Sequence, residues 1–176
     1  MIRLSKYVGI VFSIIFGANL TSHAGDHAQS TADMSGSNLR LGIGFGVASF
    51  LDSEKNAVGS LFLEGKTLNR FWSIRPVGSI AVSDEEGNYF ALGGIKEWYF
   101  YNNWSLGVGF SVGNFEEGIE EEDLGHDIEF YSRIMLGYQL KKMGLMRCEF
   151  GHISNGGLGD ENPGAEIVML SWVIDL

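Results

Sequence analysis

The chain has one cysteine, two prolines and few basic residues, and after residue 24 it has no apolar run long enough for a membrane helix. The lone Cys148 excludes an internal disulfide and any zinc site built from several cysteines. Twelve basic residues against 22 acidic ones give a formal net charge of −10. Nucleic acid is itself polyanionic, so it is not an expected partner.

The amino end does contain an apolar run. A basic start with Arg3 and Lys6 precedes an apolar segment over residues 7–20, and small residues follow up to Ala24. This order is typical of a secretory signal peptide, and the run is shorter than the roughly 20 residues of a membrane helix. We expect residues 1–24 to be removed. Residues 25–36 are small and polar, which predicts a short leader ahead of a single domain ending at residue 176.

Beyond the leader, the clearest pattern is a two-residue alternation of apolar with small or polar side chains. It is typical of β-strands, because successive side chains of a strand point to opposite faces. The alternation and the breaks between its segments predict eight strands, at 38–49, 58–66, 71–82, 88–100, 103–113, 127–140, 144–154 and 164–176.

The non-apolar faces of these strands decide between two architectures. A soluble sandwich would bury the apolar face, whereas a narrow barrel in lipid turns that face to the hydrocarbon and fills its interior with small or charged residues. Many of the 25 glycines lie on the non-apolar face, and charges of both signs lie within strands, where they could pair: Glu64, Arg75, Glu129, Arg133, Arg147 and Glu149. The pattern therefore favours an all-β, eight-stranded antiparallel transmembrane β-barrel.

The connections alternate in length, which predicts the orientation of the barrel. Longer, mostly acidic or glycine-rich segments are expected at 50–57, 83–87, 114–126 and 155–163, and short turns at 67–70, 101–102 and 141–143. This is the arrangement of long extracellular loops and periplasmic turns in a Gram-negative outer membrane. Aromatic residues near strand ends, such as Phe71, Trp72 and Trp104, are candidates for the interfacial girdles. The registers of 58–66 and 88–100 are less defined. In 88–100, Lys96 and Glu97 adjoin, so neither register of that strand is free of a charge unless it lies near the turn.

The predicted strands 144–154 and 164–176 place reactive polar side chains on the lipid-facing side of the barrel. His152 and Ser154 share a face with Phe150, and Glu166 shares one with Leu170 and Trp172. Polar groups facing lipid disfavour insertion unless they have a role. These three have the identities needed for nucleophilic catalysis: Ser154 would attack, His152 would take its proton, and Glu166 would orient the imidazole. The Asn155 and Gly157 amides that follow are candidate donors to an oxyanion.

Topology locates this constellation. With both termini in the periplasm, the end of 144–154 and the start of 164–176 lie in the outer leaflet, whose lipid in such bacteria is lipopolysaccharide. Lipid A, its membrane anchor, carries ester-linked acyl chains. The sequence therefore predicts an esterase acting on lipid A within the membrane.

A family resemblance supports this hypothesis. His152-x-Ser154-Asn155, Gly157 and a Glu166 fourteen positions after the histidine resemble the signature of PagL-type lipid A 3-O-deacylases. The resemblance implies an eight-stranded outer-membrane barrel that hydrolyses the ester at position 3 of lipid A and releases a 3-hydroxy fatty acid. It also implies a triad of His152, Ser154 and Glu166, with Asn155 and Gly157 at the oxyanion site. One departure is the chain end, Leu176, where such barrels typically have Phe.

Two alternatives stay open at this point. A small structural or adhesive barrel without chemistry would tolerate apolar replacements of all three residues, and a calcium-dependent phospholipase would lose activity with a chelator. We expect no cofactor and no metal, because His126 beside Asp127 and the acidic residues of 116–123 are more typical of a solvated loop. Cys148 is expected to be an apolar wall residue. The sequence leaves open the preferred acyl length, the regulation of activity and whether a homodimer forms.

Overall fold

The structure is a computed structural model that describes residues 38–49, 55–84, 86–118 and 124–176. These residues belong to one compact unit, Ser35–Leu176. The predicted signal peptide (1–24) and leader (25–36) lie outside the described residues. Within the described part, no helix is long and apolar enough to span a membrane.

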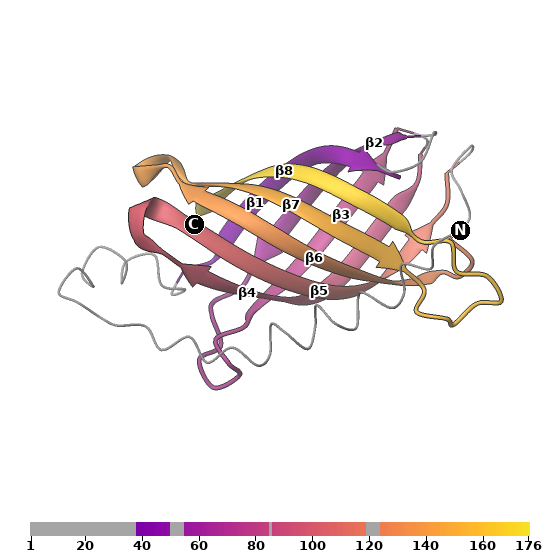
Figure 1. Cartoon of the computed structure of the whole chain (residues 1–176), viewed down its shortest axis with the longest axis horizontal. Coiled ribbons are helices and arrows are strands. Elements are labelled where there is room, and N and C mark those ends of the chain that lie inside the picture. Colours follow the sequence, from indigo (N-terminus) through magenta and orange to yellow (C-terminus); the bar gives the residue numbers. More distant parts are fainter. Residues whose placement is uncertain (1–37, 50–54, 85, 119–123) are drawn as a thin grey trace. The chain divides into compact units, whose positions relative to one another are not determined.

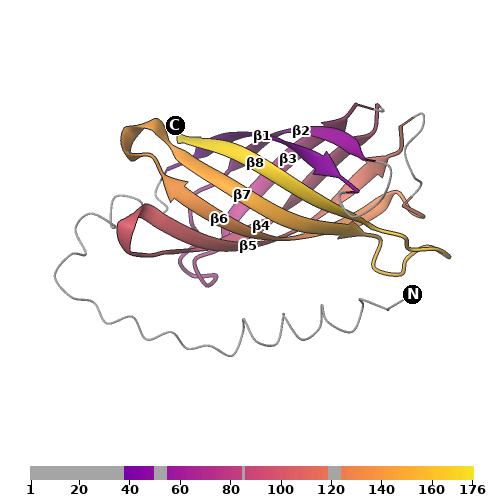
Figure 2. The same ribbon diagram turned by 45° about the horizontal axis from the view of Figure 1, so that its top comes forward.

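Eight strands form a closed barrel in which each strand pairs with its sequence neighbour and β1 pairs with β8, all antiparallel (Figure 1, Figure 2). The strands are β1 (Arg40–Ala48), β2 (Asn56–Glu64), β3 (Arg75–Ser83), β4 (Asn88–Tyr99), β5 (Trp104–Glu116), β6 (Ile128–Gln139), β7 (Leu145–Ser154) and β8 (Ala165–Asp175). Two short 3-10 turns, η1 (Tyr101–Asn103) and η2 (Lys141–Met143), join β4 to β5 and β6 to β7. The predicted fold class is confirmed.

The apolar faces of the strands point outward, as expected for a barrel in lipid. Large apolar side chains are exposed along the wall, among them Phe45 and Leu92. Glycine on the inner face makes room for interior side chains. A Cβ on Gly42 would lie 2.1 Å from the ring of Phe62, and one on Gly151 would lie 2.3 Å from Tyr131. The lumen is therefore filled by side chains rather than open.

Ion pairs inside the barrel join most of the mid-strand charges, namely Glu64, Arg75, Arg133, Arg147 and Glu149. Glu64, which is fully buried, contacts three arginines from other strands: Arg147 at 2.6 Å, Arg40 at 3.7 Å and Arg75 at 3.8 Å. Farther along the interior, Arg133 lies 3.8 Å from Glu149. Each contact offsets part of the cost of taking a charge out of water.

Lys96 and Glu97 lie on opposite faces of β4. Glu97 points inward and accepts hydrogen bonds from Arg40 and Arg147, both at 2.9 Å. Lys96, near the strand end, points outward, and its ammonium donates to the carbonyl of Trp72. A charge on the outer face is thus accommodated close to a turn.

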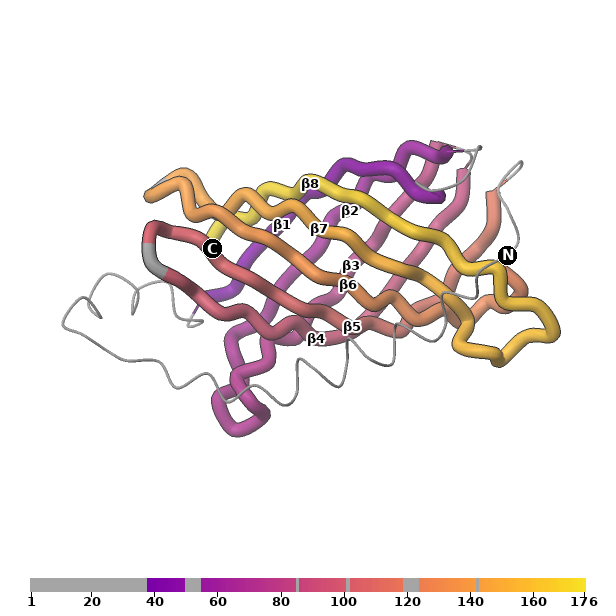
Figure 3. Tube along the Cα trace, in the orientation of Figure 1, coloured from indigo at the N-terminus to yellow at the C-terminus, as the bar shows by residue number. Residues whose placement is uncertain are grey.

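Some strand bounds differ from the prediction. β3 begins at Arg75 instead of 71, so the short turn expected at 67–70 is a loop over residues 65–74 that projects sideways from the barrel (Figure 3). The reason is local: Trp72 and Ser73 have positive φ angles of 52° and 56°, which turn the chain back into a small hairpin closed by a bridge from Leu68 to Ile74. β5 extends to Glu116, three residues beyond the expected end at 113.

Candidate active site

The candidate site lies where β7 ends and β8 begins, on the outer face of the wall. His152 and Glu166 are direct cross-strand partners, so their side chains emerge side by side on that face. The imidazole Nδ1 lies 3.5 Å from Glu166 Oε1, and the two side chains are 39% and 20% exposed. This distance is longer than the roughly 3.2 Å of a good hydrogen bond, so the two groups are in contact without a short hydrogen bond.

Ser154 lies on the same outer face, two residues after His152, and is half-buried. The backbone spacing of two strand residues is about 7 Å, so the hydroxyl and the imidazole are neighbours along the strand. Within the described residues, the Ser154 hydroxyl has no hydrogen bond to His152. Because Nδ1 faces Glu166, the nitrogen left to accept a proton is Nε2.

The loop that follows Ser154 is organised by Asn155, which is fully buried. Its side-chain amide donates to the carbonyls of Leu124 (2.9 Å) and Glu161 (2.7 Å). Its backbone amide donates to Asn162 Oδ1 at 3.0 Å, and its own Oδ1 accepts the Gly157 amide at 2.8 Å. The predicted oxyanion donors are thus close to Ser154 but are hydrogen-bonded within the loop in this structure.

Three loop residues of this neighbourhood were not predicted from the sequence: Leu124, Asn162 and Gly164. The first two contribute through loop contacts that no strand pattern reports. Gly164 has a φ of +67°, and a Cβ there would lie 2.9 Å from His152 Cε1 and 3.2 Å from Nε2. The Pro163-Gly164 pair is an ordinary turn signal, so it could have marked the turn but not its contact with the imidazole.

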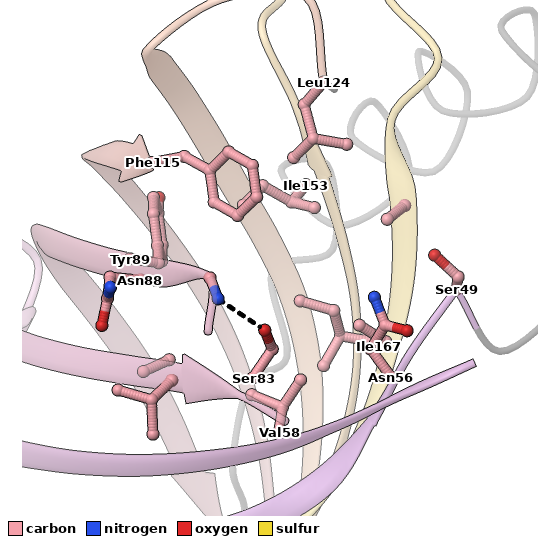
Figure 4. A pocket seen from close by; sticks show the side chains of 15 residues that line it. Ser49, Asn56, Val58, Ser83, Asn88, Tyr89, Phe115, Leu124, Ile153 and Ile167 are labelled. Atoms are coloured by element: carbon pink, nitrogen blue, oxygen red, sulfur yellow. Dashed lines mark hydrogen bonds between the residues drawn. The ribbon is translucent and has the colours of Figure 1, made fainter. Parts of the chain in front are cut away.

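Behind this part of the wall, the interior contains a mainly apolar cavity of about 70 Å³. Figure 4 shows side chains from several strands around it, including Val58, Phe115, Ile153 and Ile167, with Leu124 from the β5–β6 loop. Ile153 and Ile167 point inward, whereas their neighbours His152, Ser154 and Glu166 point outward. The polar groups therefore stand on a wall whose inner side is packed with apolar residues.

Two other residues considered from the sequence have simple environments. Cys148 is exposed on the outer face of β7, four residues before His152. His126 Nδ1 accepts the backbone amide of Ile128 at 2.8 Å, which closes the turn before β6. Among the residues that the structure describes, no group of three or more His, Cys, Asp or Glu is arranged to hold a metal ion.

Comparison with solved structures shows the fold. The barrel is similar to the outer membrane enzyme PagL, with a TM-score of 0.62 and 16% identity over 78% of this chain and 99% of that one. It is also similar to a designed transmembrane β-barrel (TM-score 0.59, 8% identity, 81% and 98% covered) and to Neisserial surface protein A (0.54, 10%, 78% and 96%). A designed barrel in this group shows that such a likeness reports architecture and not activity.

Comparison at the sequence level goes further. Curated protein sequences gave no significant match. The family model for the lipid A 3-O-deacylase PagL, however, matches residues 52–175, well over half of the chain and including the whole candidate site. The chain therefore belongs to the PagL family of lipid A 3-O-deacylases, which are outer-membrane ester hydrolases.

Proposed function

We propose that Ser154, His152 and Glu166 form a catalytic triad that hydrolyses the 3-linked hydroxyacyl ester of lipid A. Ser154 Oγ attacks the ester carbonyl carbon while His152 Nε2 takes the hydroxyl proton. When the bond from the carbonyl carbon to the sugar oxygen breaks, the imidazolium returns this proton to the departing sugar hydroxyl. Water then hydrolyses the acyl-serine by the same acid–base path and releases the fatty acid.

The observation that carries this proposal is the pairing of His152 with Glu166 on the outer face of the barrel. A carboxylate against Nδ1 leaves Nε2 to act as the base, and it stabilises the imidazolium that forms after proton transfer. The same face is otherwise apolar below the site, with Phe150 and Leu170 exposed. A substrate whose acyl chains lie in the membrane would therefore present its ester to the triad while these chains stay in an apolar environment.

We further propose that Asn155 and Gly157 stabilise the oxyanion. In this structure the Gly157 amide donates to Asn155 Oδ1. The proposal requires substrate to exchange this bond, and the bond from the Asn155 backbone amide to Asn162 Oδ1, for bonds to the carbonyl oxygen. The turn that carries these amides includes Gly156 and Gly157, whose φ angles are both positive. Donors aimed at the developing charge typically contribute about 10²- to 10³-fold in kcat.

The orientation of the barrel in the membrane decides which lipid leaflet the triad faces. We propose that the end carrying the β7–β8 loop faces outward, so that the triad meets the lipopolysaccharide leaflet. All proposed groups come from one chain, so a homodimer would carry two complete sites.

Mass spectrometry of lipid A tests the proposal. Lipopolysaccharide exposed to the refolded wild-type barrel should lose one hydroxyacyl chain, and Ser154→Ala should release none above background. Cys148→Ala is the matched control, because it changes a small outward residue of the same strand. Equal release by the wild type and Ser154→Ala would refute the assignment of the nucleophile, and no release by the folded wild type would refute the activity.

A further inference from the structure

A fourth polar side chain stands in the same row of the lipid-facing wall. Ser132 of β6 is the cross-strand partner of His152, and His152 is the partner of Glu166. Ser132, His152 and Glu166 therefore form one row across three neighbouring strands, with all three side chains on the outer face. The other outward-facing residues of β6 are apolar or aromatic, namely Ile128, Phe130, Ile134, Leu136 and Tyr138.

Ser132 is surrounded largely by apolar side chains. Its cross-strand partner on β5 is Phe110, whose ring stacks on that of Phe130 with centroids 5.9 Å apart. The Ser132 hydroxyl donates a long hydrogen bond of 3.4 Å to the carbonyl of His152. A hydroxyl in an apolar environment is costly unless it is well bonded, so a substrate group that gave it a shorter bond would be selected.

Ser132 is poorly placed to act as a second nucleophile. The imidazole of His152 leans toward β8 and the loop before it: Nδ1 faces Glu166, and Cε1 and Nε2 lie against Gly164. The nitrogen that would accept a proton is thus turned away from β6. A role in holding the substrate fits this geometry better than a role in attack.

The spacing indicates which part of the substrate Ser132 reaches. Ser132 and Ser154 are diagonal neighbours on adjacent strands, about 7–8 Å apart at the backbone. The attacked carbon lies roughly 3 Å from the nucleophile, and a hydroxyl bound by Ser132 lies about 2.8 Å from its oxygen. These lengths together span the gap when the substrate hydroxyl is only one or two carbons from the carbonyl.

We propose that Ser132 binds a hydroxyl carried by the acyl chain next to the scissile ester and so makes the site selective for hydroxyacyl esters. This proposal rests on the proposed function of the triad. Ser132 is then a specificity-determining residue, while His152, Ser154 and Glu166 carry out the reaction.

A pair of variants isolates the hydroxyl. Ser132→Thr keeps it and Ser132→Val replaces it with a methyl group of the same shape, and both β-branched residues suit a strand. The substrates are two glucosamine derivatives with a 3-O-acyl chain of equal length, one with and one without a hydroxyl on the third acyl carbon. For the wild type and Ser132→Thr we expect a higher kcat/KM with the hydroxylated ester.

For Ser132→Val we expect the ratio of the two kcat/KM values to fall by about three- to tenfold, the effect of one hydrogen bond. The value for the plain ester should stay within about twofold of wild type. Cys148→Ala, on the same face but four residues before His152 in β7, should leave both values unchanged.

The other outcomes each overturn the proposal. An equal loss with both esters would mean that Ser132 contacts the ester or the sugar, and loss of all activity in a folded Ser132→Val barrel would make it part of the catalytic machinery. An unchanged ratio would show that it contacts nothing in the substrate. In all three cases wild-type hydrolysis still supports the proposed function. If the folded wild type cleaves neither these esters nor lipid A, the proposed function fails as well.

Discussion

At the scale of single residues, the candidate site depends on a glycine that carries no chemistry. Gly164 lies against His152 Cε1 and Nε2, the side of the imidazole that the proposed mechanism uses. Its φ of +67° is a conformation that residues with a Cβ rarely adopt. A glycine at this position therefore lets the β7–β8 loop pass close to the ring and still turn into β8.

Gly164→Ala is expected to lower kcat by about 10- to 100-fold, because the added Cβ must displace the imidazole and small misplacements of catalytic groups are costly. The measurement is release of the hydroxyacyl chain from lipopolysaccharide by the refolded barrel. Gly144→Ala is the matched control: it also has a positive φ, of 110°, but lies in the turn before β7, at the other end of the strand. A folded Gly164→Ala barrel with wild-type kcat would show that the imidazole has room to move.

Residues of the site differ in how far the sequence could predict them. His152, Ser154 and Glu166 could be placed because alternation in a strand fixes the face on which each side chain emerges. Asn155 could be named, but its hydrogen bonds could not, since Leu124 is 31 residues away and reaches it through loop geometry. Ser132 escaped notice for a similar reason: its row with His152 depends on the register between β6 and β7, which alternation within one strand does not give.

At the scale of elements, the loop over residues 65–74 is the main departure from the predicted fold. It presents Phe71 and Trp72, which are 67% and 76% exposed, and it carries Lys66 and Arg70 in a chain of net charge −10. The Lys96 ammonium, from the outer face of β4, holds it by bonding the Trp72 carbonyl. The alternation of 71–82 could not show this, because the positive φ of Trp72 reflects the hairpin and not the apolar pattern.

This loop is expected to lie in the membrane interface, where amphipathic aromatic rings and basic side chains are favoured. The measurement is tryptophan fluorescence of the barrel in phospholipid vesicles, with Trp72→Phe used to subtract the other tryptophans. Quenchers attached near the lipid headgroups should quench the Trp72 component more strongly than quenchers near the ends of the acyl chains. Strong quenching by aqueous iodide, without quenching from either lipid depth, would place the loop in water instead.

At the scale of the whole molecule, two kinds of contact hold the barrel together. The β1–β8 ladder closes the sheet, and ion pairs across the lumen link strands on different sides of it. Arg147 of β7 bonds Glu64 of β2 at 2.6 Å and Glu97 of β4 at 2.9 Å, so this one guanidinium links strands that are not neighbours in the sheet. From the sequence, the mid-strand charges could pair inside a barrel, where an unpaired charge would be costly. The sequence could not predict the partners, since these depend on the stagger of the closed barrel.

The central position of Arg147 predicts a large loss of stability when it is removed. Arg147→Met leaves Glu64 without its closest cation and Glu97 without one of its two arginine partners. Removing one partner of a buried pair typically costs about 3–5 kcal/mol. Urea unfolding of the barrel in vesicles should show a correspondingly lower free energy of unfolding. Lys141→Met removes an exposed cation from η2 and should change this free energy by less than about 0.5 kcal/mol. Adding Glu64→Gln to Arg147→Met should recover part of the lost stability, because it removes one of the carboxylates that have lost their partner. A double variant less stable than Arg147→Met would mean that Arg40 and Arg75 are the main partners of Glu64.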